Sequence, residues 1–206
     1  MDIHHFLWFG SVMASLKSFL FGCAPFLGTT GAALYERQRA LVNLGVLETT
    51  AGRGPGSGVP FTAENFAAIL ISLLAAESLS KVDEYVVDLC NAQPEGTLPL
   101  NEYRRLWESL GKPTFMSDFG RVLAGQQTVW KPFKGLVEAV RVTRPWRGQI
   151  VLGAPRRPLC YFPDDSDKFM VAKSISVTTE IEEEMLSKLI VFTKGALSQA
   201  AAEDDE

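Results

Sequence analysis

Histidine is almost absent from this chain, which carries only His4 and His5 among its 206 residues. A Ser-His-Asp or Cys-His site needs an imidazole as its general base, and two adjacent histidines next to the N-terminus offer no convincing one. Met13 and the residues after it resemble an alternative start, which would remove both histidines. The shortage argues against a hydrolase of these classes, and we predict that the protein is not an enzyme.

Motifs for metals and nucleotides are missing as well. The three cysteines have no paired spacing, which excludes a zinc motif or a disulfide framework and favours a reducing compartment. The acidic residues from Asp164 to Asp167 lack the glycine and the distal glutamate of a calcium loop. The segment from Gly52 to Gly58 precedes a helix, but it has neither a P-loop lysine nor a third glycine at the dinucleotide spacing. We therefore predict no cofactor and no metal.

The apolar stretch from Phe6 to Phe26 raises the question of export or membrane insertion. No basic residue precedes it, and Phe21 is bulky at a position where a lipobox ending in Cys23 needs a small side chain. Lys17 would lie near the centre of a bilayer at a cost of about 3 kcal/mol. The sequence predicts a cytoplasmic protein with no membrane partner.

Charge is distributed unevenly around a net value of -4. The stretch from Arg104 to Arg157 has eleven basic and three acidic residues, whereas the chain from Pro158 onward has four lysines and eleven acids. A stretch of +8 gives reason to expect a polyanion such as nucleic acid as partner. The basic and acidic segments could equally attract each other, or different partners.

Helical periodicity dominates the first two thirds of the chain. A short apolar helix is expected over Ala14 to Phe21, and Thr29 or Thr30 can cap a helix from Gly31 to Gly45. After a glycine-rich turn, Thr62 can cap a helix from Ala63 to Ala76. Further helical patterns run from Leu79 to Leu89, from Tyr103 to Leu110 and from Ser117 to Ala124, with a pause at Gln93 to Gly96.

The pattern changes from helical to alternating beyond Gln127. We therefore predict an α+β protein: a helical domain over 13–127, a small antiparallel sheet with a C-terminal helix over 128–199, and an acidic tail over 200–206. The expected strands and the final helix are Leu136 to Thr143, Gln149 to Leu152, Leu159 to Phe162, Phe169 to Val177 and the helix Thr179 to Leu197.

The elements between Ala14 and Ala76 carry a family resemblance. Arg39-Ala-Leu-Val-Asn-Leu-Gly-Val-Leu47 is followed by the glycine-rich turn with Arg53, and then by Phe61 and the helix that starts there. This order resembles winged helix-turn-helix regulators of the MerR-like arrangement, in which a recognition helix, a basic wing, an aromatic residue and a further helix follow one another. The chain departs from that family at Pro60, where an arginine is usual.

The resemblance implies double-stranded DNA as partner and a transcriptional regulator, with phage or prophage regulators as one class, that binds as a homodimer. Arg39 and Asn43, one turn apart, are types that read guanine and adenine edges. The expected DNA-binding residues are Thr30, Tyr35, Arg37, Arg39, Asn43 and Arg53. The alternative is a non-enzymatic adaptor or phage assembly protein, in which Arg39 and Asn43 are a solvated helix face and the C-terminal domain contacts another protein.

Overall fold

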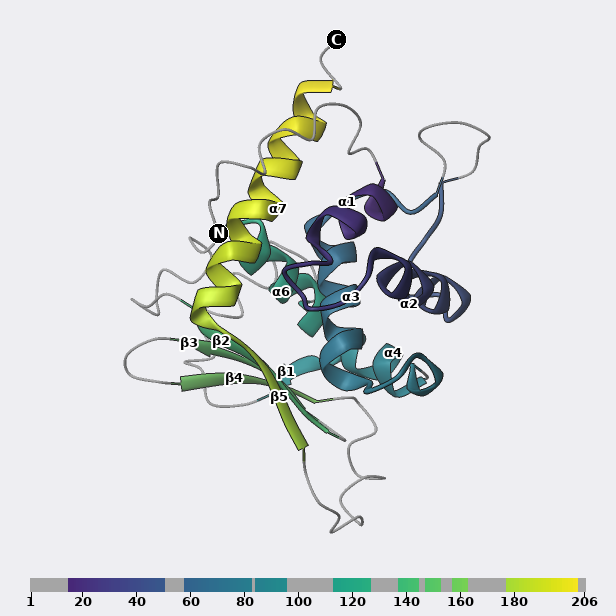
Figure 1. Ribbon diagram of the computed structural model, residues 1–206. Helices are drawn as coiled ribbons and strands as arrows, with labels where there is room; N and C mark the ends of the chain where they lie inside the picture. The colour runs from purple at the N-terminus through teal and green to yellow at the C-terminus, as the bar shows by residue number, and fades with distance from the viewer. Residues whose placement is uncertain are drawn as a thin grey trace.

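Helices and one sheet form two layers in the computed structural model (Figure 1). The structure describes residues 15–50, 58–82, 84–95, 113–126, 137–144, 147–152, 157–162 and 177–203. Within these ranges the chain is mixed α+β, as predicted, with a five-stranded antiparallel sheet and a long C-terminal helix. The expected helix Tyr103 to Leu110, Arg53 and nearly all of the expected strand Phe169 to Val177 lie outside the described residues.

The first three helices begin where capping residues occur in the sequence. Ser15, Thr30 and Thr62 each have extended backbone, and each side-chain oxygen accepts a hydrogen bond from the amide three residues later. The helices that follow these caps are α1 (Leu16–Cys23), α2 (Gly31–Asn43) and α3 (Ala63–Ala75). Beyond them the described helices are η2 (Leu79–Lys81), α4 (Glu84–Asn91), α6 (Phe115–Leu123) and α7 (Glu183–Glu203).

The sheet has the strand order β1-β4-β3-β2-β5, and every neighbouring pair is antiparallel. Its strands are β1 (Gln93–Glu95), β2 (Val137–Arg144), β3 (Arg147–Leu152), β4 (Arg157–Phe162) and β5 (Val177–Glu182).

Three sequence-based boundaries are corrected by this sheet and by α7. The expected pause at Gln93 is the edge strand β1, which pairs with β4. The expected start of the last helix at Thr179 is wrong, because Thr179 to Glu182 pair with β2. Helix α7 begins at Glu183 and continues through Glu203, so Ala200 to Glu203 are helical rather than part of a tail. Residues 204–206 lie outside the described part.

One face of the sheet packs against α3, α6 and α7. Val140 and Val142 of β2 and Ile150 of β3 point to this side and are fully buried. Phe19 of α1 contacts Phe192 of α7, with ring centroids 4.9 Å apart. Buried side chains from Leu16 to Ala196 thus form one hydrophobic cluster, which includes residues from both sides of the domain boundary expected near Thr128.

Close packing of α6 on α3 depends on Gly120. A Cβ at this position would lie 2.8 Å from the Cα of Glu64 and 3.0 Å from its amide nitrogen, and backbone atoms cannot move aside as a flexible side chain can. We expect Gly120→Ala to lower the free energy of unfolding by about 2 kcal/mol, measured by urea denaturation.

Gly195 supplies a matched control, since it also lies inside a helix, but apart from its chain neighbours and the backbone of its own helix no atom is within 4 Å of the position that a Cβ would take. Gly195→Ala is expected to raise stability by about 0.5–1 kcal/mol through helix propensity alone. Equal effects of the two substitutions would contradict the close α3–α6 contact.

None of the helices in the described part of the chain is long and apolar enough to cross a membrane.

Candidate nucleic-acid interface

Helix α2 is held at the surface by elements on either side of it. It packs against α1 and α3, and Leu34 and Leu41 on its inner side are fully buried. Gly28 has a φ of 62°, a left-handed conformation that glycine adopts without strain, in the turn that leads from α1 to α2. Figure 1 shows α2 on the side of the helical layer away from α7.

Two isolated antiparallel β-bridges fix the path of the chain after α2. Thr50 pairs with Gly58, which brings together the two ends of the segment that contains Arg53. Ser15 pairs with Pro60, and the Leu16 amide donates to the Val59 carbonyl at 2.9 Å. These contacts join the start of α1 to residues 58–60, which follow the glycine-rich segment and lead into α3.

The outward side of α2 carries Arg39 and Asn43, both exposed and one turn apart. The Arg39 side chain is 60% exposed, and its Nη1 lies 3.1 Å from the carboxylate of Glu36. Exposed pairs of this kind contribute little stability, so the guanidinium can leave Glu36 at small cost. The structure therefore presents these two predicted side chains together at the surface.

Tyr35 lies in α2 and Thr30 is the N-cap of that helix, and the two side chains make different contacts. Tyr35 is half-buried, and the Nζ of Lys17 from α1 lies 4.6 Å from the centre of its ring. The Thr30 hydroxyl is committed to capping α2, since it accepts from the Ala33 amide at 3.2 Å. Lys17 was not among the sequence-predicted site residues, because only the packing of α1 on α2 brings it next to Tyr35.

Arg37 is inside the fold, unlike Arg39 two residues later. It is 9% exposed, and its guanidinium donates to the carbonyls of Ser72 at 2.7 Å and Ala76 at 3.0 Å. These carbonyls belong to the C-terminal end of α3, which has no basic residue of its own in its last turn. Arg37 therefore binds the end of α3, and this expected DNA-binding residue does not share the outward side of α2 with Arg39.

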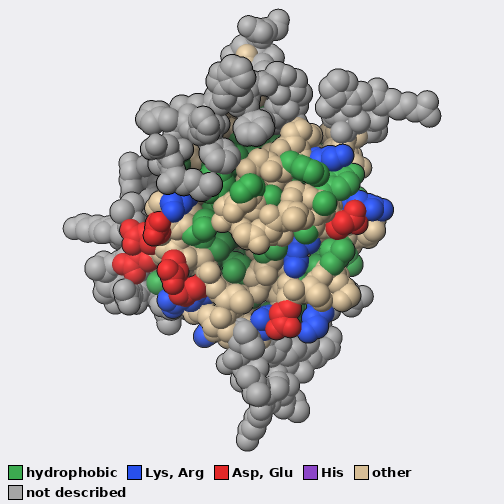
Figure 2. Space-filling model, viewed as in Figure 1, with side chains coloured by type: hydrophobic (Ala, Val, Ile, Leu, Met, Phe, Trp, Pro, Cys, Tyr) green, Lys and Arg blue, Asp and Glu red, His purple; other side chains and the backbone are tan. Residues whose placement is uncertain are grey.

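The basic stretch does not form one uniform surface among the described residues. Arg121 pairs with Asp118, Arg141 with Glu180 and Arg144 with Glu77. Basic and acidic side chains are interspersed on the face seen in Figure 2. The charge of this stretch is thus largely balanced where its side chains are described, which leaves α2 and its surroundings as the candidate surface for a polyanion.

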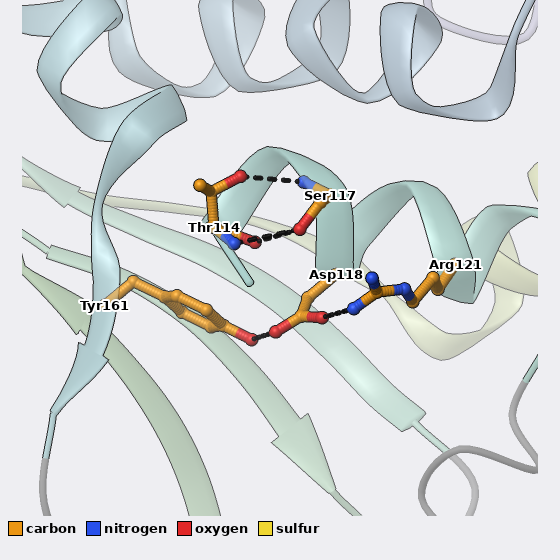
Figure 3. Close-up of polar contacts among 5 residues, drawn as sticks. All are labelled: Thr114, Ser117, Asp118, Arg121 and Tyr161. Carbon is orange, nitrogen blue, oxygen red and sulfur yellow. Dashed lines mark hydrogen bonds and ion pairs between the residues drawn. The ribbon is translucent and has the colours of Figure 1, made fainter. Parts of the chain in front are cut away.

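A second polar group, between α6 and the sheet, is enclosed (Figure 3). Tyr161 of β4 donates to Asp118 Oδ2 at 2.8 Å, and Arg121 Nη1 lies 2.6 Å from Asp118 Oδ1. Burial raises the pKa of Asp118 to about 6, because desolvation outweighs the hydrogen bond from Tyr161 and the charge of Arg121. This carboxylate is 2% exposed and joins α6 to β4, so its role is structural.

The cysteines Cys23 and Cys90 offer no activated nucleophile. Burial raises the pKa of each to about 12, which keeps both thiols protonated at neutral pH. Among the described residues, no three His, Cys, Asp or Glu side chains are close enough together to hold a metal ion.

Comparison with protein-family models, with curated proteins and with solved structures gave no significant match to this chain.

Proposed function

We propose that this protein is a sequence-specific, double-stranded DNA-binding transcriptional regulator of the winged helix-turn-helix type, with α2 as its recognition helix. The observation that carries the proposal is the exposed pair Arg39 and Asn43 on a helix whose opposite side is buried. Arginine hydrogen-bonds guanine and asparagine hydrogen-bonds adenine in the major groove. Thirteen residues make a helix about 20 Å long, which the major groove accommodates.

The surroundings of α2 support contacts to the DNA backbone. Lys17 and Tyr35 lie together beside the outward face, and an ammonium and a phenol are suitable donors to neighbouring phosphates. The bridge between Thr50 and Gly58 is what a wing requires at its base, and Arg53 on that wing would reach the minor groove or the backbone. Arg37 has no part in the proposal, because its guanidinium is used inside the fold.

We further propose that the regulator binds as a homodimer. Two copies related by a two-fold axis present two recognition helices to half-sites about one helical turn apart. The expected target is then a palindromic sequence. Sedimentation of the protein with and without a selected duplex measures the stoichiometry.

Selection from a random duplex library, followed by fluorescence anisotropy of the enriched sequence, tests the proposal. Replacing both Arg39 and Asn43 with alanine is expected to weaken binding by about 30-fold or more and to abolish preference over scrambled DNA. Lys17→Ala is expected to weaken binding to all sequences and to reduce the salt slope by about one.

Lys188→Ala is the matched control, because Lys188 is also an exposed cation on a helix and is paired with Glu184 within one turn. It should leave affinity within about twofold. Glu36→Gln should raise affinity a few-fold, since it frees Arg39 and removes a negative charge that faces DNA. The proposal is refuted if no duplex is retained at low salt, or if the double variant keeps the wild-type preference.

A further inference from the structure

The outward side of α2 is a narrow stripe made up of Ala32, Glu36, Arg39 and Asn43. At about 100° per residue, their spacing keeps them within about 60° of the helix circumference and spreads them over about 16 Å of its axis. The remaining charged residue of α2, Arg37, is buried, so Glu36 and Arg39 are the two charges of this stripe. A duplex that lies along the stripe therefore meets an ion pair near its centre.

The ion pair uses only one nitrogen of the Arg39 guanidinium. Both carboxylate oxygens of Glu36 accept from Nη1, each at 3.1 Å, and no other group of the described residues accepts from this guanidinium. Nη1 and Nη2 each carry two hydrogens, so Nη1 can donate to Glu36 and to a second acceptor at once. Nη2, Nη1 and a carboxylate oxygen thus present a donor, a donor and an acceptor in that order, on side chains that are 60% and 46% exposed.

This order is the complement of one base pair. In the major groove a G·C pair presents the acceptors N7 and O6 of guanine and then the N4 amino donor of cytosine. O6 and N4 are hydrogen-bonded to each other and are about 2.9 Å apart. Nη1 and the Glu36 oxygens are separated by 3.1 Å, which is close to that spacing. An A·T pair presents an acceptor, a donor and an acceptor, which would place the carboxylate opposite thymine O4.

A carboxylate on this side of α2 acts against affinity, because it faces a polyanion. That is the reason for the gain in affinity expected of Glu36→Gln. A group that weakens binding to every sequence still raises specificity if it weakens binding to wrong sequences more. Thymine O4 repels the Glu36 carboxylate, whereas the cytosine N4 amino group donates to it. Glu36 therefore has the chemistry of a residue that discriminates between bases.

We propose that Glu36 is a specificity-determining residue and that the Glu36–Arg39 pair reads a single G·C base pair as one unit. Arg39 donates to N7 and O6 of guanine, and Glu36 accepts from the N4 amino group of the paired cytosine on the other strand. This inference rests on the proposed binding of DNA by α2, and it adds a contact that reports the orientation of the base pair.

Fluorescence anisotropy with base analogues in the duplex enriched from the random library tests it. The analogues are placed at the base pair whose preference Arg39→Ala removes. N4-methylcytosine replaces the free N4 hydrogen with a methyl group and should weaken binding of the wild type about tenfold. Glu36→Ala should bind the modified and the unmodified duplex within about twofold of each other. Guanine without N7, as 7-deazaguanine, should weaken the wild type and Glu36→Ala alike, because Arg39 is present in both.

Two matched controls separate this contact from crowding and from general charge effects. A duplex with 5-methylcytosine adds a methyl group to the same base but keeps the N4 hydrogens, and the wild type should bind it within about twofold of the unmodified duplex. Glu184→Gln removes a carboxylate that is also exposed and paired with a cation one turn away, and it should respond to each analogue as the wild type does.

The role of Glu36 is overturned if N4-methylcytosine leaves wild-type binding unchanged, or if it weakens Glu36→Ala as much as the wild type. Either result leaves recognition of guanine by Arg39 standing, since 7-deazaguanine reports that contact separately. An equal loss with 5-methylcytosine also overturns the role of Glu36, because crowding by the methyl group would then explain the effect. Failure to retain any duplex at low salt refutes the proposed DNA binding itself, and this inference with it.

Discussion

Replacing Arg37 with alanine is expected to lower the free energy of unfolding by about 3 kcal/mol. The guanidinium makes two charge-assisted hydrogen bonds to the carbonyls of Ser72 and Ala76 at the end of α3. The C-cap of that helix is Ala76 in an extended conformation, and its amide donates to the Ser72 carbonyl at 3.1 Å, but no left-handed glycine follows to close the end of the helix. Alanine at position 37 takes the guanidinium donor away from the Ala76 carbonyl, leaves the Ser72 carbonyl with the Ala76 amide alone, and removes a cation from the negative end of the helix dipole.

Urea denaturation measures the free energy of unfolding of Arg37→Ala, and Arg39→Ala serves as a control on the same helix. Arg39 is exposed, and its alanine variant is expected to change stability by no more than about 0.5 kcal/mol. Arg37→Lys should give an intermediate value, because an ammonium cannot donate to both carbonyls with the geometry of the guanidinium. If Arg37→Ala weakened DNA binding without loss of stability, the assignment of Arg37 to the fold would be wrong.

Asp118 is expected to make stability depend on pH between about 4 and 6. Its pKa is about 6 in the folded protein, against an ordinary value of 3.8. A carboxyl group whose pKa is raised by folding binds more protons in the native state, so the free energy of unfolding falls as pH rises through this window. The size of the effect is on the order of 3 kcal/mol.

Comparison of the wild type with Asp118→Asn by urea denaturation from pH 4 to pH 7.5 isolates this contribution. Asparagine can accept from Arg121 and donate to the Tyr161 oxygen, so the contact between α6 and β4 is kept without a titrating group. The free energy of unfolding of the wild type minus that of Asp118→Asn should fall as pH rises from about 4 to 6, and it should stay constant at higher pH. Identical pH profiles would show that Asp118 is ionised in the fold at its ordinary pKa.

Tyr161→Phe gives an independent readout of the same group. The Tyr161 hydroxyl stabilises the ionised carboxylate, so its removal should move the pH-dependent transition to higher pH. The ring still packs against Phe115, whose centroid lies 5.0 Å away, which limits the loss of packing. A transition that moved to lower pH would contradict the hydrogen bond from Tyr161 to Asp118.

Local signals predicted the helices well where the chain carries its own caps. Thr30 and Thr62 begin α2 and α3 as expected from their side-chain oxygens, which satisfy amides that helix geometry leaves free. Alternation similarly placed β2, β3 and β4 within a few residues of their observed ends. Strand β5 was missed because its residues from Thr179 onward also fit the helical pattern expected over Thr179 to Leu197, and only the pairing with β2 selects the extended form.

The sequence by itself determined the α+β class, the caps of the early helices and the spacing that puts Arg39 and Asn43 one turn apart, because these follow from side-chain chemistry and periodicity along the chain. The tertiary structure alone decided what each charged side chain does. Arg37 and Arg39 have the same chemistry and stand two residues apart, yet packing against α3 buries the first and leaves the second exposed. Lys17 beside Tyr35 and Asp118 beside Tyr161 likewise depend on contacts between distant segments, whose energies no local pattern encodes.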